Sequence, residues 1–273
     1  MRFLYWNLHR KPIQKLVADL THEHRPDVVI LSECEFHLAE FLPELNTPLK
    51  QKYGLPFSPI PDPVFLVRLP RNSLKLVNDH SGVCIRRLIP PIGPDVLIIA
   101  VHLPSKLHQG DNDQALSATR LARYIEQAEE KTGHRRTLIV GDLNMNPFED
   151  GVVGAEGLHA IMDRDIVAKK SRIVQGEERF FFYNPMWNHF GNFPRPPAGT
   201  YFYSGSKQIS YFWNMFDQMM IRADLLEYFN DESLKILTSA GSTSLLNSSK
   251  RPDKERASDH LPIMFDLDLI KGV

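Results

Sequence analysis

The sequence predicts an α/β fold, and three observations carry that prediction. The chain opens with a strand-like run, a helical pattern and a second strand-like run. Residues 64–101 hold a series of strand-like runs separated by short turns. A long amphipathic pattern over residues 111–131 then leads into another strand-like run at Thr137. No internal repeat, low-complexity tract or linker interrupts the chain, so we expect one domain over residues 1–273.

The opening unit leaves two polar residues at strand ends. Residues 2–7 predict a strand that ends in Asn7, and Pro12 suits the first turn of the helix that follows. Apolar residues recur at helical spacing from Ile13 to Leu20. Residues 28–31 form an apolar run typical of a strand that is covered on both faces, and Ser32 and Glu33 follow it.

The middle of the chain predicts a short helix and then several strands. A short amphipathic helix fits residues 36–45, and a loop fits residues 48–63. Short turns between the next runs favour antiparallel pairing. These runs span residues 64–69, 73–77 and 82–87, and an apolar strand over 95–101 leads into His102.

The second half mixes one long helix with shorter elements. The helix over 111–131 carries an apolar stripe and stops at Gly133. We expect short helices over 157–167 and 225–229, an extended segment over 234–237, and strands over 216–221 and 263–269.

The stretch from Thr137 to Pro147 ends a strand in two polar side chains. If the extended geometry persists past Gly141, Asp142 and Asn144 point to the same side, because every second residue of a strand shares a face. Such strand ends are where open α/β sheets usually bind ligands. The alternative is an Asx turn, in which the two residues only cap the strand.

Composition excludes some classes of function. Lys plus Arg number 32 against 33 Asp plus Glu, a formal net charge of −1, so any polyanion must be bound by a local patch. Cys34 and Cys84 are too few for a disulfide framework. Neither a signal-peptide pattern nor an apolar run of membrane-spanning length is present, so we expect a cytoplasmic protein without membrane contact.

Aromatic residues crowd into residues 177–216. The rings either stack on nucleic acid bases or pack in the core. For the first interpretation, nearby cations supply phosphate contacts. These cations are Lys169, Lys170, Arg172, Arg179, Arg195 and Lys207.

The polar residues near strand ends form a set in which oxygen ligands predominate. Such a set favours Mg²⁺ or Mn²⁺ over zinc and suits phosphate chemistry. Its members are Asn7, Glu33, His102, Asp142, Asn144, Asp217, Asp259 and His260.

In order and approximate spacing, six short motifs resemble those of the endonuclease/exonuclease/phosphatase superfamily, a group of metal-dependent phosphoesterases. The resemblance spans nearly the whole chain and implies a four-layer α/β/β/α sandwich, with two mixed β-sheets packed face to face. The motifs are Trp6-Asn7, Leu31-Ser32-Glu33, Val101-His102-Leu103, Gly141-Asp142-Leu143-Asn144, Phe216-Asp217-Gln218 and Ser258-Asp259-His260.

The resemblance also implies roles in the site. Glu33 looks like the main ligand of Mg²⁺ or Mn²⁺, helped by Asn7 and Asp259. His260 looks like the residue that activates water or contacts the scissile phosphate, and Asp217 accepts its other ring N–H.

The remaining implied roles concern the nucleophile and the phosphate. Asp142 resembles the acid that positions the nucleophile, and Asn144 the amide that holds a phosphoryl oxygen. His102 resembles the second histidine of the deoxyribonuclease-like branch. His9 stands where apurinic-site enzymes carry an acid, which puts a second metal ligand in doubt and makes His9, like Lys106, a candidate for substrate binding.

The resemblance predicts a metal-dependent hydrolase that cleaves phosphodiesters by in-line attack of water, with nucleic acid as the leading substrate. Lipid or inositol phosphates and a non-catalytic nucleic-acid-binding module of the same fold remain alternatives. Basic residues that suit a nucleic acid backbone are Arg68, Arg71, Lys75, Arg86, Arg87, Lys106 and the charged run over 250–256.

Overall fold

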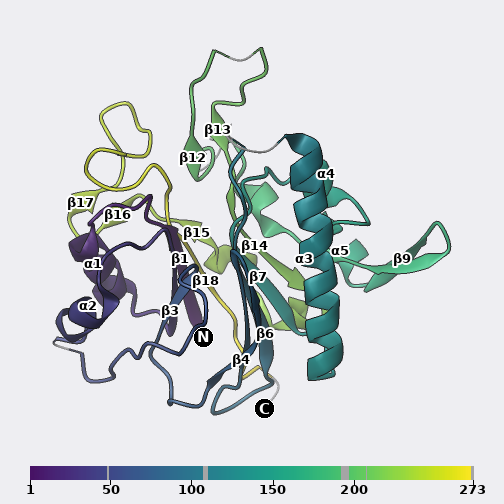
Figure 1. The fold of residues 1–273 in the computed structure, drawn as a ribbon, viewed down its shortest axis with the longest axis horizontal. Helices are drawn as coiled ribbons and strands as arrows, with labels where there is room; N and C mark the ends of the chain where they lie inside the picture. Colours follow the sequence, from purple (N-terminus) through teal and green to yellow (C-terminus); the bar gives the residue numbers. More distant parts are fainter. Residues whose placement is uncertain (48, 107–109, 192–196, 207, 272–273) are drawn as a thin grey trace.

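Two β-sheets face each other, with helices on the outer side of each (Figure 1). The computed structural model describes all residues of the chain except 48, 107–109, 192–196, 207 and 272–273. The helices α1 and α2 cover one sheet, and the helix α3 covers the other (Figure 1). The predicted four-layer sandwich with two mixed sheets is therefore confirmed.

The first sheet has five strands in the order β15-β18-β1-β2-β3. The parallel pair of β1 and β2 is joined by α1, as the opening strand–helix–strand pattern predicts. The strands β18 and β3 flank this pair, each antiparallel to its neighbour. The bounds are β1 (Arg2–Asn7), α1 (Gln14–His24), β2 (Val28–Ser32), α2 (Leu38–Leu45), β3 (Val64–Val67), β15 (Lys235–Ile236) and β18 (Ile263–Asp266).

The second sheet has seven strands in the order β4-β5-β6-β7-β14-β11-β8. The helix α3 connects the parallel neighbours β6 and β7, and β14 lies antiparallel to β7. The bounds are β4 (Leu74–His80), β5 (Val83–Leu88), β6 (Val96–His102), α3 (Asp111–Thr132), β7 (Thr137–Asp142), β8 (Ala160–Ile161), β11 (Phe182–Tyr183) and β14 (Asp217–Arg222).

The strand-like runs over residues 64–101 divide between the two sheets. Pairing is antiparallel from β4 to β6, as predicted, but β3 pairs with β2 in the other sheet. The expectation of one continuous series is wrong at this point. All four residues of β3 are buried, and an apolar run of this kind does not reveal which sheet it joins.

A hairpin and several short elements were not predicted. The short helix expected over 157–167 is replaced by β8 and the one-turn helix α5 (Arg164–Val167). Strands β9 (Ser171–Val174) and β10 (Glu177–Phe180) form a hairpin through Gln175 and Gly176, whose φ angles are 51° and 88°. The other short elements that were not predicted are α4 (Asp150–Val153), η1 (Pro185–His189), β12 (Tyr201–Phe202), β13 (Trp213–Asn214), η3 (Asp231–Ser233), β16 (Ser239–Ala240) and β17 (Thr243–Ser244). The short helix expected over 225–229 is present as the 3-10 helix η2 (Ala223–Tyr228).

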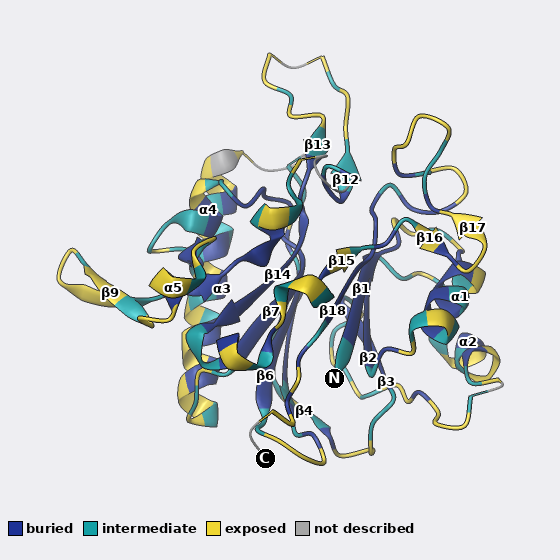
Figure 2. Ribbon diagram, turned by 180° about the vertical axis from the view of Figure 1, so that it is seen from behind, coloured by how far each residue is buried: buried dark blue, intermediate teal, exposed yellow. Residues whose placement is uncertain are grey.

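The core lies in three layers between the sheets and helices. Side chains alternate along β1, so one strand contributes to two of these layers. Phe3 and Tyr5 face the second sheet, while Leu4 and Trp6 face the helices α1 and α2. A third layer joins α3 to the second sheet. Figure 2 shows the central strands of both sheets as buried, whereas the edge strands β4 and β15 are half-buried or exposed.

The aromatic segment divides between core and surface. Phe181, Phe182, Tyr183 and Phe216 are buried, as the core interpretation predicts. Others are exposed or half-buried, and Phe193 lies outside the described residues. Cys84 is buried, whereas Cys34 is half-buried, and both thiols are free. None of the described helices is both long and apolar enough to span a bilayer.

Candidate active site

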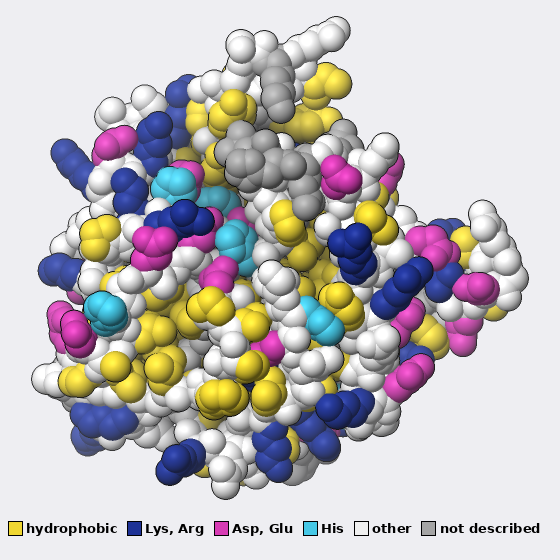
Figure 3. Space-filling model, viewed as in Figure 1, with side chains coloured by type: hydrophobic (Ala, Val, Ile, Leu, Met, Phe, Trp, Pro, Cys, Tyr) yellow, Lys and Arg dark blue, Asp and Glu magenta, His cyan; other side chains and the backbone are white. Residues whose placement is uncertain are grey.

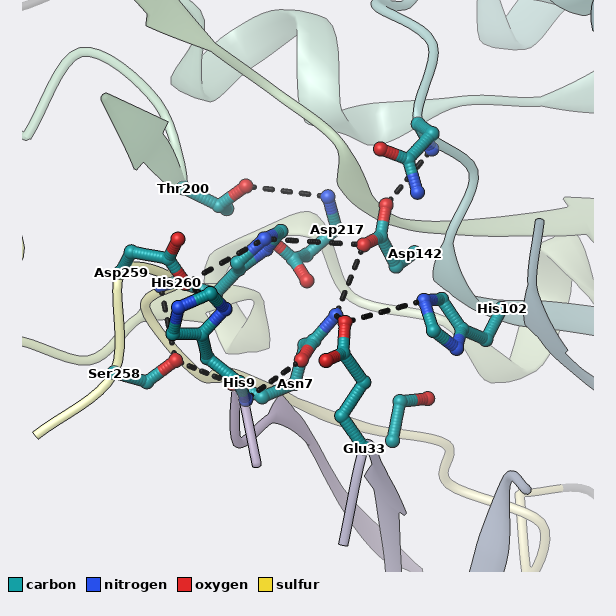
Figure 4. A network of polar contacts seen from close by, with 12 residues as sticks. Asn7, His9, Glu33, His102, Asp142, Thr200, Asp217, Ser258, Asp259 and His260 are labelled. Carbon is teal, nitrogen blue, oxygen red and sulfur yellow. Dashed lines mark hydrogen bonds and ion pairs between the residues drawn. The ribbon is translucent and has the colours of Figure 1, made fainter. Parts of the chain in front are cut away.

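The ends of strands from both sheets meet at one place. Asn7 pairs with Ser32 in the first sheet, and Asp142 pairs with both His102 and Asp217 in the second. The loop before β18 adds Ser258, Asp259 and His260 from the far end of the chain. Figure 4 shows these side chains pointing toward one another, so the residues of the predicted set from six separate segments lie together.

The end of β7 positions Asp142. Gly141 has a φ of 149°, and a Cβ there would lie 1.9 Å from the carbonyl oxygen of Val101. The backbone N–H of Asn144 donates to Asp142 Oδ1 over 2.8 Å, and Asn144 has a φ of 51°. The extended geometry therefore stops at Asp142, and the Asx turn is present within the site itself. Expecting two side chains on one face of a strand was wrong.

Asn7 links two carboxylates. Its Nδ2 donates to Asp142 Oδ2 over 3.0 Å and lies 3.4 Å from Glu33 Oε1. Its Oδ1 accepts the backbone N–H of His9 over 2.9 Å. In this orientation the amide presents N–H groups to the carboxylates and turns its oxygen toward the His9 backbone.

His260 is held by hydrogen bonds on several sides. Its Nδ1 lies 2.8 Å from Asp217 Oδ2, and its backbone N–H donates to Ser258 Oγ. The Ser258 hydroxyl donates to the carbonyl oxygen of Asn7, and Trp6 Nε1 donates to that of His260. These bonds fix the imidazole so that Nε2 faces Asp142 Oδ2 over 3.9 Å.

Burial and neighbouring charges shift the ionisation of this pair. Burial alone lowers the pKa of His260, but the carboxylates of Asp217 and Asp142 outweigh it and raise the pKa to about 10. Burial raises the pKa of Asp142 to about 6, against the opposing effect of the His260 charge. The surrounding carboxylates therefore favour the protonated form of the His260 ring.

A second Asp–His pair lies beside the first. His102 Nδ1 lies 2.6 Å from Asp62 Oδ2, and Asp62 Oδ1 accepts the backbone N–H of Glu33 over 2.9 Å. Burial lowers the pKa of His102, but Asp62 reverses this, and the net pKa is raised. Asp62 was missed in the sequence because it lies within the loop over 48–63. Its only signal is an acid flanked by Pro61 and Pro63.

The turn after β1 brings two basic side chains to the carboxylates. His9 Nδ1 lies 3.4 Å from Asp259 Oδ1, and Arg10 Nε lies 3.3 Å from Glu33 Oε2. Both residues have positive φ angles and exposed side chains. His9 is thus at the site, as predicted, whereas Arg10 was missed. A basic run directly after a strand end was the available signal.

Asn144 and Lys106 lie nearby but are engaged with protein groups. Asn144 Nδ2 donates to the carbonyl oxygen of Leu103 over 2.9 Å, and the residue is 7% exposed. Lys106 forms an ion pair with Glu149 Oε2, and its Nζ lies 5.9 Å from the centroid of the Phe216 ring. Any phosphate contact by Lys106 therefore competes with Glu149.

Several basic residues expected to follow a nucleic acid backbone do not lie near the site. Arg86 is buried against Asp79, and Arg87 pairs with Asp95. Both sit toward the end of β5 remote from Gly82, whose carbonyl oxygen accepts from His102 N–H. Arg68 pairs with Asp27 at the opposite end of β2 from Glu33.

Three of the cations around the β9–β10 hairpin are likewise engaged with other side chains. Lys170 pairs with Asp224, Arg179 with Glu156, and Arg172 donates to His159. This hairpin projects from the far edge of the second sheet (Figure 1). Arg195 and Lys207 lie outside the described residues.

The donor set fits a divalent cation. Asp142, Asp217 and His260 offer ligand atoms that lie within 4.8 Å of one another. Among the described residues, Asp217 Oδ1 and Asp259 Oδ1 are buried oxygens with no hydrogen-bond partner. Since Glu33 adds another carboxylate, the site concentrates negative charge and oxygen ligands, which are the ligands that Mg²⁺ and Mn²⁺ prefer.

A sandwich of two mixed sheets with paired acids and histidines at its strand ends defines a class of phosphoesterases, and the family comparison agrees. The model of the Endonuclease/Exonuclease/phosphatase family matches residues 4–231. The chain therefore belongs to this family. Its members are hydrolases that act on phosphodiester bonds and are typically dependent on a divalent metal.

Solved structures share the fold over nearly the whole chain. An apurinic-site endonuclease from Archaeoglobus fulgidus is 13% identical with a TM-score of 0.57, covering 98% of this chain and 99% of its own. The 3′ phosphatase NExo from Neisseria, bound to a product DNA hairpin, is 14% identical with a TM-score of 0.57 and the same coverage. The human Nocturnin catalytic domain is 15% identical with a TM-score of 0.54, covering 97% of this chain and 93% of its own. No curated protein sequence matches the chain.

Proposed function

We propose that this chain is a divalent-metal-dependent nuclease, folded as one domain over residues 1–273, that hydrolyses phosphodiester bonds of DNA or RNA. The observation that carries the proposal is the buried Asp217–His260 pair facing Asp142 where strands of both sheets end. A pair that is buried, hydrogen-bonded and turned toward a second acid suits proton handling at a reacting phosphate.

The gap between His260 and Asp142 suits a water or a phosphate oxygen. Their atoms Nε2 and Oδ2 are 3.9 Å apart, which is too long for a direct hydrogen bond. Asp217 keeps His260 Nδ1 occupied, so Nε2 is the nitrogen that faces the substrate. We assign Asp142 to orienting and deprotonating the attacking water, and His260 to contacting the scissile phosphate.

His102 repeats this arrangement from the other side. Asp62 occupies Nδ1, so Nε2 faces Glu33 Oε1 over 3.5 Å. We assign His102 to donating a proton to a phosphate oxygen or to the leaving alkoxide, with Asp62 as the positioning residue. Asn144, Lys106 and His9 are assigned to phosphate oxygens around the same centre.

We assign Mg²⁺ or Mn²⁺ to Glu33, Asn7 and Asp259. When bound, such an ion supplies Lewis-acid stabilisation of negative charge on phosphate oxygens. The compact group of Asp142, Asp217 and His260 also offers ligand atoms, but the hydrogen bond between Asp217 and His260 occupies two of them. We therefore keep that group for proton transfer. Oxygen ligation by Asn7 requires its amide to rotate away from the His9 N–H.

Nucleic acid is the favoured substrate because two of the similar structures are described by their action on DNA or by a DNA ligand. One is an apurinic-site endonuclease, and another is bound to a DNA hairpin. The name "3′ phosphatase" of the latter makes phosphate removal from a DNA end the second candidate. Lipid or inositol phosphates and a non-catalytic module are less well supported, since a binding module has no need of two Asp–His pairs.

A digestion panel tests the proposal. The purified chain is incubated with plasmid DNA, single-stranded DNA, RNA, a 3′-phosphorylated oligonucleotide and an inositol polyphosphate, each with Mg²⁺, Mn²⁺ or EDTA. We expect cleavage of at least one nucleic acid with either metal and none with EDTA. Turnover of the inositol phosphate alone, or nucleic acid binding without turnover, would overturn it.

A further inference from the structure

The hairpin formed by residues 201–206 and 208–214 is the feature that the catalytic assignment leaves unexplained. It contains β12 and β13 and projects beyond the sheets at the same end as the loop between β17 and β18, as Figures 1 and 2 both show. Its exposed aromatic side chains are Tyr203 (46%), Tyr211 (54%) and Phe212 (51%). Exposed rings grouped on one projecting element indicate a binding role.

The base of this hairpin touches the site. The Tyr201 ring lies 4.7 Å from the His260 imidazole and 5.2 Å from the Phe216 ring. Tyr203 follows two residues later, and its N–H donates to the carbonyl oxygen of Phe212, so the ladder continues to this point. Alternation places Tyr203 on the same face as Tyr201, about 7 Å further from His260 along the strand.

The opposite face of the hairpin carries a separate aromatic group. Phe202 contacts the Trp213 ring at 5.5 Å, and the Arg251 guanidinium lies 4.1 Å from the Phe202 centroid. Phe212 has a φ of 60°, and its ring lies 6.4 Å from that of Phe202. A regular strand would place Phe212 opposite Tyr203 and on the same face. The left-handed residue instead brings Phe212 close to Phe202, and the Tyr203 ring lies against Gly205 while 46% of the residue stays exposed.

Positive charge lies next to the hairpin. The loop between β17 and β18 carries four exposed cations, and none of them forms an ion pair with another described residue. Figure 3 shows Lys and Arg side chains gathered over this region, beside the histidines and acids of the site. Unpaired cations next to exposed rings are the two components that bind a single-stranded backbone and its bases. The four cations are Lys250, Arg251, Lys254 and Arg256.

We propose that this hairpin binds an unpaired nucleotide next to the scissile phosphate by stacking its base on Tyr203, while the four cations contact backbone phosphates. The proposal rests on the proposed nuclease function and narrows its substrate to single strands or locally unpaired strands. In a duplex the flat faces of the bases are already stacked on one another, so a ring reaches only a base that has left the stack.

A base-free polymer isolates the stacking contact. Kinetics are measured on oligothymidine, on a polymer of abasic tetrahydrofuran residues of equal length, and on a duplex. Stacking on one ring predicts that Tyr203→Ala raises KM for oligothymidine by between about 5-fold and 150-fold. KM for the base-free polymer is expected to stay unchanged, because it offers no base to stack. Oligouridine in parallel distinguishes RNA from DNA.

Matched variants separate stacking from folding. Tyr203→Phe keeps the flat ring and is expected to match the unmodified chain, whereas Tyr203→Leu keeps apolar bulk without the ring and is expected to behave like Tyr203→Ala. Ile173→Ala removes an exposed apolar side chain (69%) from the β9–β10 hairpin and is expected to leave KM unchanged for both substrates.

The outcomes distinguish the two proposals. If Tyr203→Ala raises KM equally for oligothymidine and for the base-free polymer, or raises it for neither, stacking on Tyr203 is overturned. Cleavage of duplex alone by the unmodified chain also overturns it, while the nuclease function stands. If the unmodified chain cleaves no nucleic acid of any kind, both proposals fall together.

Discussion

The orientation of His260 depends on hydrogen bonds from distant parts of the chain. Its Nδ1 is held by Asp217 in β14, and its backbone N–H by Ser258, which is itself bonded to Asn7 in β1. A ring fixed on so many sides loses little conformational freedom when a substrate binds. The entropic cost of reaching the transition state is therefore small.

Replacing His260 is therefore expected to stop turnover while the fold remains. We expect His260→Gln to lower kcat by about 10²- to 10⁴-fold, since the amide has no ionisable group for a phosphate. Gln still carries a donor for Asp217, so the melting temperature should change little. Steady-state kinetics and thermal melting measure both effects.

The control for this variant is His24→Gln. His24 ends α1, and its carbonyl oxygen accepts from Arg2 at the end of β1 opposite to Asn7. Its replacement should leave kcat unchanged. Full activity of the His260→Gln variant would contradict the assignment of His260.

Asp62 is expected to act only through His102. Asp62→Asn removes the carboxylate that accepts from Nδ1–H of His102. The imidazole is then no longer held in one tautomer and orientation, and we expect kcat to fall. If Asp62 has no other role, adding Asp62→Asn to His102→Ala should cause no further loss in kcat. Double-mutant kinetics measure this coupling, and two losses that multiply would show that Asp62 acts independently.

At the level of residues, the site was predictable where an apolar run ends in a polar side chain. Glu33, His102 and Asp142 all stand in that position, and the structure brings them together. Asp62 and Arg10 come from irregular segments without a period, so no pattern marks them. The Asx turn at Asp142 depends on the left-handed backbone of Asn144, which sequence spacing does not specify.

At the level of elements, the junction of β6 and β7 is the most constrained part of the site. Gly141 lies against the backbone of Val101 with no room for a Cβ, and Asp142 follows it directly. Any movement of this strand therefore moves the acid that faces His260.

Gly141→Ala is expected to be strongly destabilising. The added methyl meets a backbone oxygen at 1.9 Å, and the positive φ of 149° adds strain. We expect the free energy of unfolding to fall by about 3 kcal/mol or more, together with loss of activity. Urea denaturation measures the effect.

Gly176→Ala is the matched control. Its φ of 88° is also positive, but nothing lies within 4 Å of the added methyl. It should cost only about 1–2 kcal/mol, from backbone strain alone. Equal losses for the two variants would show that contact with β6 is not the cause.

His159 is expected to make stability fall in mild acid. Burial and the Arg172 guanidinium lower the pKa of His159 to about 4 in the folded chain, against 6.5 for the free side chain. Between pH 6.5 and 4 the unfolded chain binds the proton and the folded chain does not, so stability decreases as pH falls through this window. The slope cannot exceed about 1.4 kcal/mol per pH unit.

Melting temperatures of the unmodified chain and of His159→Gln, compared from pH 7.5 to 4.5, test this. The variant should lose less stability across the window. Parallel curves for the two proteins would show that His159 does not titrate differently on folding.

Elements with a buried face were the ones that the sequence predicted well. The strands β1, β2, β6 and β7 and the helix α3 all carry an apolar pattern that matches their period. The exposed hairpin of β9 and β10 has no such pattern, and its turn at Gln175 and Gly176 lacks the common Asn-Gly signal. The assignment of β3 to the first sheet depends on long-range pairing, which local composition does not report.

At the level of the whole molecule, the site is shared between the two sheets. Glu33 and Asn7 extend from the first sheet, while Asp142 and Asp217 extend from the second. The carboxylates repel one another across the boundary, so a divalent cation between them should stabilise the packing of the sheets.

Adding Mg²⁺ is accordingly expected to raise the melting temperature. At a tenfold excess over its dissociation constant, an ion that binds only the folded chain adds about 1.4 kcal/mol, which corresponds to a few degrees. EDTA should reverse the gain and abolish hydrolysis. Glu33→Gln should show a smaller gain, and a gain equal to that of the unmodified chain would remove Glu33 from the ligand set.

The hydrogen bond from Ser258 to Asn7 joins residues that are 251 positions apart, and β18 pairs with β1 over a similar separation. During translation, β1 must therefore wait for β18. A ribosome-bound chain holds Asn7 and Glu33 early but lacks Asp259 and His260 until residues 34–258 have also been added. The proposed site can be completed only after residues 258–266 have left the exit tunnel.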